Sequence, residues 1–449
     1  MSEDNRLTSA EETFVLAEQV LDLPVINQMI WRFDTPLDAD RLKKVVDRLR
    51  SGPLTRRLHR AGAPFARDTW FAAPPSAPVL RIDDTIDPAR LIEWLDHDID
   101  REFHTDSGAP WTVSAVPLDD GGHVVAFTAP HTLSDGTGIN AAFEAAVTGR
   151  DIGRLPDDNA VVPSRLHDVR DGARQLVAAG RGLAGAVRLT ARNRKGRGAV
   201  DRRTPPPQPR RPAVIPVADA EDSAYALAAF SAEDWHHAAN LRGGSANSLL
   251  VAIGVGLLEA AGRIDDVPEI PVSMPVTVRT SGDRRAIATI GATLAVGTDR
   301  SRYDDLRPIR SAARDALTRA TDPDRDSDDL LRLITPIVRL LPRKVLRSLA
   351  LRQPAAVLTC SNLGELPQDV ATLGASTPGQ VAVRMAVQHA TVEQLRAARG
   401  GLTVWLSFSA GTAMLSVLSM DPDLWPNRAA VQRAITEEAA KWSLAPTFW

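Results

Sequence analysis

The sequence predicts a two-domain α/β protein in which each half contains a mixed sheet flanked by helices. Short apolar runs typical of strands alternate with helical patterns in both halves of the chain. With 449 residues, of which 44% are hydrophobic, the chain is long enough to bury two cores. A basic and then proline-rich segment separates the halves. We therefore expect an N-terminal half over residues 1–180, a linker over 181–219 and a C-terminal half over 220–449.

The N-terminal half contains one helix with clear spacing. Asp38 is a typical N-cap residue, and Leu42, Val45, Val46 and Leu49 follow at intervals that place them on one helix face. This pattern predicts a helix with one side against a core. A second helix is expected over residues 88–99, and strands are expected over 25–33, 79–82, 112–116 and 124–128.

The C-terminal half shows the same alternation, although no internal repeat is visible by residue identity. Gly243, Gly244 and Ser245 precede an apolar run and are interpreted as the start of a helix. Helices are expected over residues 245–261, 304–320 and 426–442, and strands over 224–230, 271–278, 289–296, 356–360, 402–408 and 413–418.

Composition and charge exclude several classes of function. A formal net charge of −3 does not favour nucleic-acid binding, and no apolar run approaches the roughly 20 residues of a membrane span. The first residues are polar, so no signal peptide is expected. Cys360 is the only cysteine, which excludes internal disulfides and cysteine-rich metal sites. We expect a cytoplasmic protein with no metal site, phosphate-binding loop or dinucleotide motif.

Two basic segments allow more than one interpretation. Residues 181–211 include Arg192, Arg194, Lys195 and Arg197 before a proline cluster, which predicts a basic helix followed by a linker. This segment is either a solvated connection or a surface that attracts an anionic donor. Residues 330–353 mix aliphatic and basic side chains. They form either an amphipathic helix pair over a core or a surface for peripheral lipid contact.

The most informative short motif is the H-x-x-x-D-G spacing of His131, Asp135 and Gly136. The motif follows the apolar strand over 124–128 and precedes an alanine-rich helix over 138–147. An imidazole at a strand end can act as a general base when a local hydrogen bond fixes its other ring nitrogen. Asp135 is expected to turn away and hold the loop on a distant arginine, while Gly136 lets the backbone turn. The structural alternative is a strand-end histidine beside an Asp-Gly turn.

Three further segments accompany this motif. Residues 103–122 predict a hairpin that leads into the strand before His131. Residues 274–279 form an apolar strand ending in Arg279, and residues 359–364 form a strand that ends in a polar turn with Ser361 and Asn362. In this order, the four segments resemble the chloramphenicol acetyltransferase-like superfamily. Its members include condensation domains, polyketide-associated acyltransferases, bacterial wax ester synthases and plant BAHD acyltransferases.

The resemblance implies a fold of two halves with a tunnel at their interface, through which donor and acceptor reach His131 from opposite faces. It also implies that Asp135 pairs with Arg279 across this interface and that the pair supports the active-site loop. Ser361, Asn362 and nearby backbone N–H groups are the candidate donors to an oxyanion or to substrate.

Two departures narrow the choice of subfamily. Condensation domains and wax ester synthases usually carry two adjacent histidines, whereas Pro130 precedes His131 here. The D-F-G-W-G segment of the plant enzymes is absent. These departures favour a stand-alone acyltransferase of the polyketide-associated or antibiotic-modifying kind.

We therefore expect an acyltransferase that moves an acyl group from a thioester donor to a hydroxyl or amine of a small molecule, in bacterial secondary or lipid metabolism. The donor is acyl-CoA or an acyl carrier protein, so the coenzyme A or phosphopantetheine thioester is substrate and no cofactor stays bound. The protein is expected to be a monomer. Two alternatives stay open, namely condensation-type amide formation on carrier-bound substrates and a catalytically inactive recruitment module.

Overall fold

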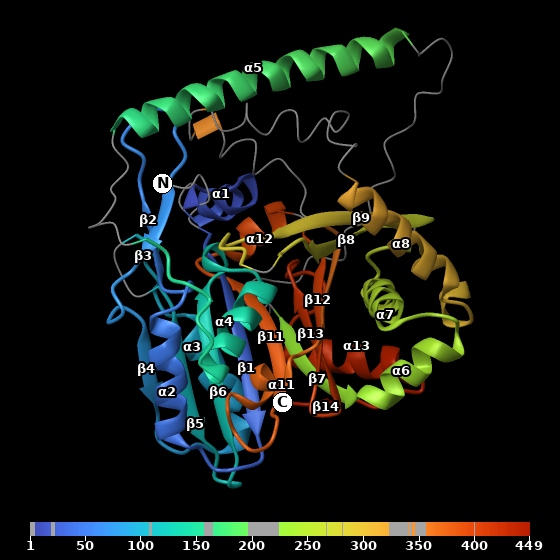
Figure 1. The fold of residues 1–449 in the computed structure, drawn as a ribbon. Coiled ribbons are helices and arrows are strands. Elements are labelled where there is room, and N and C mark those ends of the chain that lie inside the picture. The colour runs from blue at the N-terminus through green and yellow to red at the C-terminus, as the bar shows by residue number, and fades with distance from the viewer. Residues whose placement is uncertain are drawn as a thin grey trace.

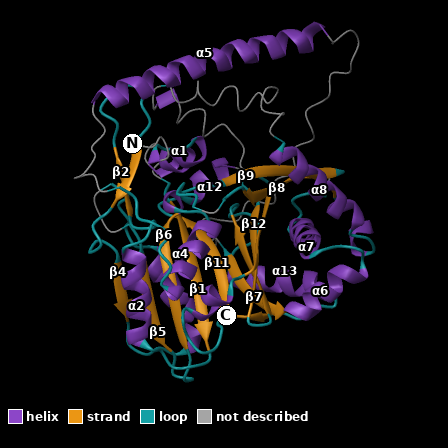
Figure 2. Cartoon of the chain, viewed as in Figure 1, coloured by secondary structure: helices purple, strands orange, loops and turns teal. Residues whose placement is uncertain are grey.

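The computed structural model describes most of the chain, and its helices and strands form two sheets with helices packed around them (Figures 1 and 2). The described residues are 5–18, 23–106, 110–156, 165–195, 224–265, 267–280, 282–322, 341, 344–345, 356–398 and 400–449.

The first sheet belongs mainly to the N-terminal half. Its strands are β1 (Val25–Phe33), β4 (Val79–Ile82), β5 (Thr112–Pro117), β6 (His123–Pro130) and β11 (Gln380–Val387). Their order is β11-β1-β6-β5-β4, and all neighbours are antiparallel except β4 and β5. β5 and β6 form the predicted hairpin before His131. Its turn contains Gly121, whose φ of +91° is accessible to glycine without strain.

The second sheet belongs to the C-terminal half. Its strands are β7 (Tyr225–Ser231), β8 (Glu269–Thr277), β9 (Thr289–Gly297), β10 (Leu358–Glu365), β12 (Leu402–Ser409), β13 (Thr412–Ser419) and β14 (Thr447–Phe448). Their order is β14-β7-β13-β12-β10-β8-β9. β10 is parallel to both β8 and β12, so the carboxyl ends of these three strands lie at one edge. A separate hairpin joins β2 (Arg56–His59) to β3 (Thr69–Ala72).

The sheets do not divide at the predicted linker. β11 follows β10 in the chain, but it pairs with β1 of the first sheet. β1 in turn pairs with β6 on its other side. The predicted half over residues 220–449 therefore contributes an edge strand to the sheet of the first half. The exact domain bounds stay a prediction.

Helices lie around both sheets (Figure 2). In the first half these are α1 (Ser9–Leu16), α2 (Ala39–Arg50), α3 (Leu91–Ile99), α4 (Gly136–Thr148) and α5 (Arg165–Lys195). In the second half they are α6 (Ala232–Leu241), α7 (Ala246–Ala260), α8 (Arg307–Thr321), α11 (Gln368–Thr372), α12 (Val392–Ala398) and α13 (Arg428–Ala440). Asp38 caps α2. The four residues of α2 that the spacing placed on one face are buried, namely Leu42, Val45, Val46 and Leu49.

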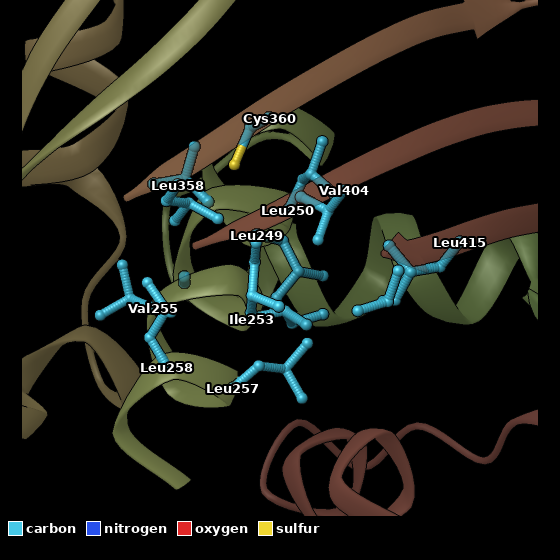
Figure 3. Packing of buried hydrophobic residues seen from close by; sticks show 14 of the residues in the cluster. Leu249, Leu250, Ile253, Val255, Leu257, Leu258, Leu358, Cys360, Val404 and Leu415 are labelled. Carbon is cyan, nitrogen blue, oxygen red and sulfur yellow. The ribbon is translucent and has the colours of Figure 1, made fainter. Parts of the chain in front are cut away.

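The C-terminal core forms where α7 packs on the second sheet. Leu249, Leu250 and Ile253 of α7 lie close to Leu358 of β10, as Figure 3 shows. A Cβ at Gly254 would lie 2.9 Å from the Leu358 side chain, so this glycine allows the helix to approach the strand closely. A separate apolar cluster contains residues of both sheets and of α3, and therefore joins the two halves.

Most predicted elements are present. The helices over 88–99, 245–261, 304–320 and 426–442 and all ten predicted strands correspond to elements whose bounds differ by a few residues. The predicted basic helix corresponds to the last turns of α5, but the side chains of Arg192, Arg194 and Lys195 and all of Arg197 lie outside the described residues. Nearly all of the predicted segment 330–353 also lies outside them.

Within the described ranges, the structure contains no single helix that is long and apolar enough to cross a membrane. α6 and α7 taken together have the length and apolar composition of a membrane span, but the chain bends by 86° between them. α7 is buried in the C-terminal core along most of its length.

Candidate active site

His131 is placed by the end of the central strand β6. The chain leaves the strand at Pro130 and enters a single 3₁₀ turn over His131–Leu133. Phe14 of α1 stacks on the imidazole, with ring centroids 4.2 Å apart and an interplanar angle of 12°. The ring is therefore held between the strand end and an N-terminal helix.

Burial sets the protonation of this histidine. It lowers the pKa of His131, because a buried imidazole disfavours the charged form, while the residue's own backbone carbonyl and the Asp135 carboxylate oppose this shift. The imidazole is therefore neutral at neutral pH and can accept a proton. The buried Nδ1 makes no hydrogen bond of standard geometry with a described residue, although the residue's own backbone carbonyl acts on the ring, as the predicted local hydrogen bond requires. Stacking on Phe14 also restrains the ring.

Asp135 turns away from the imidazole, as predicted, and supports the loop. It is the N-cap residue of α4 and accepts a hydrogen bond from the Gly138 N–H at 2.8 Å. Its other carboxylate oxygen accepts bonds from the Ala288 N–H at 2.7 Å and from the Thr289 hydroxyl at 3.1 Å. One oxygen therefore caps the helix that follows, while the other holds backbone and a hydroxyl that are distant in sequence.

Arg279 completes the support of this loop. Its guanidinium lies 2.9 Å from the Asp135 carboxylate, with side chains only 12% and 5% exposed, so the predicted buried ion pair is confirmed. The guanidinium also donates to the backbone carbonyls of Asp283, Arg285 and Ala286. Burial raises the pKa of Asp135, but Arg279 and the hydrogen bonds to the carboxylate outweigh this and hold the pKa below its usual value.

Two glycines fit closely around this pair. The predicted reason for Gly136, a turn that requires glycine, is wrong, because Gly136 is the first residue of α4 and its φ is not positive. A Cβ there would lie 3.3 Å from the Leu363 side chain of β10. Gly138, which the sequence argument did not select, is tighter. Its Cβ would lie 2.3 Å from Ser134 Oγ and 2.9 Å from Arg279 Nη2.

Ser361 and Asn362 lie on β10, just before Leu363, whose side chain is close to Gly136. The amide of Asn362 donates to the Asn247 side chain, and its carbonyl accepts from the Gly364 N–H at 2.8 Å. The pairing of β10 with β12 is irregular between Asn362 and Glu365. The strand end is therefore close to the His131 loop, while the predicted role of Ser361 and Asn362 as oxyanion or substrate donors stays a prediction.

Two acidic residues of the N-terminal segment were missed by sequence reasoning. Glu11 is buried and accepts hydrogen bonds from the N–H groups of Ala286 and Ile287, in the segment that follows Arg279. It also completes a capping box with Thr8, and this T-x-x-E pattern is a signal that could have found it.

Glu18 lies beside the His131 loop. Its carboxylate accepts hydrogen bonds from the hydroxyls of Thr132 at 3.3 Å and Thr105 at 3.0 Å. Burial raises the pKa of Glu18, against the effect of these two hydrogen bonds. No local sequence pattern places Glu18 or the stacked Phe14 at this site, because both depend on how α1 docks.

The described residues contain no cluster of three or more histidine, cysteine, aspartate or glutamate side chains that could hold a metal ion. At the loop, the arrangement offers a neutral imidazole at a strand end, a fixed backbone and nearby hydrogen-bond donors. The loop lies at the junction of the halves, because Asp135 and Gly136 contact residues that follow β8 and a residue of β10.

Comparison with solved structures identifies the fold. The first condensation domain of the calcium-dependent antibiotic synthetase superposes with a TM-score of 0.59 at 16% identity, covering 98% of this chain and 97% of that one. The wax ester synthase/diacylglycerol acyltransferase from Marinobacter aquaeolei VT8 gives 0.54 at 12% identity, covering 98% of each chain. The nonribosomal peptide synthetase FmoA3 gives 0.57 at 17% identity, covering 98% of this chain and 44% of that one.

The fold and the site thus define an α/β protein of two sheets with an H-x-x-x-D-G loop at their junction. Its fold is the two-domain chloramphenicol acetyltransferase-like fold of condensation domains and of a wax ester synthase, as predicted from the sequence. No protein-family model and no curated protein sequence matches the chain. This chain spans 44% of the length of FmoA3 but nearly the whole length of the single condensation domain.

Proposed function

We propose that this protein is an acyltransferase that moves an acyl group from a thioester donor to a hydroxyl or amine of a small molecule, with His131 as the general base. The observation that carries the proposal is the imidazole at the end of β6, kept neutral by burial and placed on a loop fixed by Asp135 and Arg279. The fold of a known wax ester synthase and of condensation domains supports a reaction of this class.

The proposed step needs no covalent enzyme intermediate. His131 takes the proton of the acceptor O–H or N–H as the acceptor atom attacks the thioester carbonyl carbon. The C–S bond then breaks, and the imidazolium returns the proton to the departing thiolate. Such a base contributes about 10² to 10⁴ in rate. The developing oxyanion is stabilised by donors at the end of β10, for which Ser361, Asn362 and backbone N–H groups are the candidates.

The donor is proposed to be acyl-CoA or an acyl carrier protein, so that coenzyme A or phosphopantetheine enters with the substrate. The second candidate function is amide condensation on carrier-bound substrates. The observation that favours it is the extent of the likeness to a single condensation domain, which covers nearly all of both chains. A recruitment module without catalysis is disfavoured, because the complete H-x-x-x-D-G loop with its buried ion pair is retained.

The test is a mass-spectrometric screen of the purified protein. Panels of acyl-CoA and of acyl carrier protein are each combined with model alcohol and amine acceptors. Transfer to an alcohol supports the first proposal, whereas transfer to an amine from carrier protein alone supports condensation.

We predict that His131→Ala lowers turnover by about 10²-fold or more without changing the circular-dichroism spectrum. His237→Ala is the matched control, because His237 is an exposed histidine on α6. Unchanged turnover in His131→Ala would remove the catalytic assignment.

A further inference from the structure

The helix α5 lies along one side of the molecule, apart from both sheets (Figure 1). It contains 31 residues and is therefore about 46 Å long. Its first turns are fixed to the body by two buried carboxylates. Asp168 pairs with Arg6 at 2.7 Å, and Asp171 pairs with Arg67 at 2.8 Å. A Cβ at Gly172 would lie 2.6 Å from the Pro64 carbonyl oxygen, so this side of the helix is closely packed.

This attachment determines which face of α5 points outward. Residues 168, 171, 172, 175, 179 and 182 are buried and share one face. The exposed side of the helix carries aliphatic side chains, with Leu166 and Val169 three residues apart and Val169, Leu176 and Leu183 at successive spacings of seven. Among the described residues, eleven large hydrophobic side chains are exposed, and five of them lie on this face: Leu166, Val169, Leu176, Val177 and Leu183. Leu166 and Leu183 are 60% and 57% exposed, so this face has no apolar partner among the residues that the structure describes.

Within residues 165–185, the exposed charged side chains beside this apolar face have one sign. Within residues 165–185 the only carboxylates are Asp168 and Asp171, and both are buried in the attachment. The exposed ionic side chains of this stretch are arginines, at positions 165, 170, 174 and 181. In an ideal helix with 100° per residue, positions 170, 174 and 181 lie along one border of the apolar face, and position 165 lies along the other.

We propose that α5 binds the surface of an anionic membrane. A straight helix with an aliphatic face bordered by arginines places the aliphatic side chains among acyl chains and the guanidinium groups at the phosphates. A second copy of this chain fits less well, because two such faces would bring arginines of like sign together. The inference rests on the helix alone and does not depend on the proposed acyl transfer.

Membrane binding through α5 has a consequence for the rest of the molecule. Arg6, which holds Asp168, lies just before α1, and α1 carries the Phe14 ring that covers His131. Figure 1 shows α1 beneath α5. The side of the molecule nearest the lipid is therefore the side from which α1 covers the His131 loop, and a hydrophobic substrate would arrive there.

The experiment measures co-sedimentation of the purified full chain with vesicles of phosphatidylcholine alone and with vesicles containing phosphatidylglycerol. We expect binding to the anionic vesicles to be about tenfold or more tighter and to weaken as salt rises. Leu176→Asp with Leu183→Asp should remove binding, whereas Arg170→Ser with Arg181→Ser should lower it and reduce its dependence on salt.

The matched control is Leu241→Asp on α6, because Leu241 is 69% exposed but lies far along the chain from α5. This control should bind as the unchanged protein does, and circular dichroism should show that all variants are folded. The proposal is overturned if anionic and neutral vesicles bind equally, or if the α5 aspartates leave binding unchanged. It is also overturned if the unchanged protein does not bind vesicles but self-associates or captures a purified acyl carrier protein, and Leu176→Asp with Leu183→Asp abolishes that association.

Discussion

At the scale of single residues, the contact of Phe14 with His131 determines the chemistry of the imidazole. The stacked ring excludes water from one face, and burial is the largest cause of the lowered pKa of His131. A general base must be neutral, so activity is expected to fall only when the pH falls below the ordinary histidine value of 6.5.

This relation predicts the effect of Phe14→Ala on the pH profile of kcat/KM. Without the aromatic ring, water reaches the imidazole, its charged form is less disfavoured, and the acid limb should move to higher pH. Phe14→Leu is the control, since it keeps an apolar cover and should leave the limb near its original position. An acid limb that is identical in both variants, or that moves to lower pH in Phe14→Ala, would contradict the role assigned to burial.

The two glycines of the loop also make a prediction at this scale. Gly138→Ala should lower the free energy of unfolding by about 1–3 kcal/mol, because its Cβ would overlap Ser134 Oγ and crowd the Arg279 guanidinium. Gly136→Ala should cost less, since its Cβ meets only the flexible end of Leu363. Chemical denaturation measures both values. An equal cost at the two positions would mean that the Arg279 contact does not limit the space at Gly138.

At the scale of elements, the carboxylates of Asp135 and Glu11 tie three segments together. Asp135 joins the start of α4 to Arg279 and to the backbone at Ala288, and Glu11 joins α1 to the backbone at Ala286. The segment after β8 is therefore fixed from both the H-x-x-x-D-G loop and the N-terminal helix. This explains how a loop between secondary elements keeps the imidazole in one place.

A double-mutant cycle tests this arrangement. Breaking the buried pair with Asp135→Ala or Arg279→Ala should cost about 3–5 kcal/mol of stability and most of the activity. Asp135→Ala should cost more, because it removes the carboxylate beside the Arg279 guanidinium and also leaves the N–H groups of Gly138 and Ala288 without their acceptor. In Arg279→Ala, Asp135 keeps both N–H donors.

The double variant should be more stable than the sum of the single losses predicts, without regaining activity. Urea denaturation and steady-state rates give both readouts. Strictly additive losses would show that the two side chains are not energetically coupled.

At the scale of the whole molecule, β11 joins the two halves through Arg384. This buried arginine donates to Gln28 of β1 at 2.7 Å and pairs with Asp96 of α3 at 2.7 Å. Its guanidinium also lies 4.5 Å from the ring centroid of Tyr225 on β7, in the second sheet. Asp96 in turn pairs with Arg428 of α13 at 2.9 Å. Polar contacts thus connect the halves alongside the apolar cluster they share.

We therefore predict that Arg384→Ala lowers the free energy of unfolding by about 2 kcal/mol or more, because it leaves the side-chain carbonyl of the buried Gln28 without its donor. Arg433→Ala on α13 is the control and should change stability by no more than about 0.5 kcal/mol, since Arg433 is exposed. Thermal unfolding should also become less cooperative in Arg384→Ala, as the halves lose a connection. A value for Arg384→Ala equal to that of the control would show that the halves are held by the apolar cluster alone.

Local patterns were sufficient for many elements and for the core of the site. The helix after Asp38, the hairpin before His131 and the buried helix after Ser245 were predictable, because capping residues and hydrophobic periodicity act over a few neighbouring positions. The pairing of Asp135 with Arg279 was predictable only through the resemblance to a superfamily. The strand β11 was missed, although its sequence is apolar, because nothing in it signals that it leaves its own half to pair with β1.

The sequence by itself determined the α/β class and the position of His131 at a strand end, since each depends on side chains close together in the chain. Tertiary structure alone decided which residues surround the imidazole. Phe14, Glu18 and the backbone near Ala288 meet the loop from segments far away in the sequence. The physical reason is that burial, which lowers the pKa of His131, is a property of packing between distant segments and leaves no pattern in either segment alone.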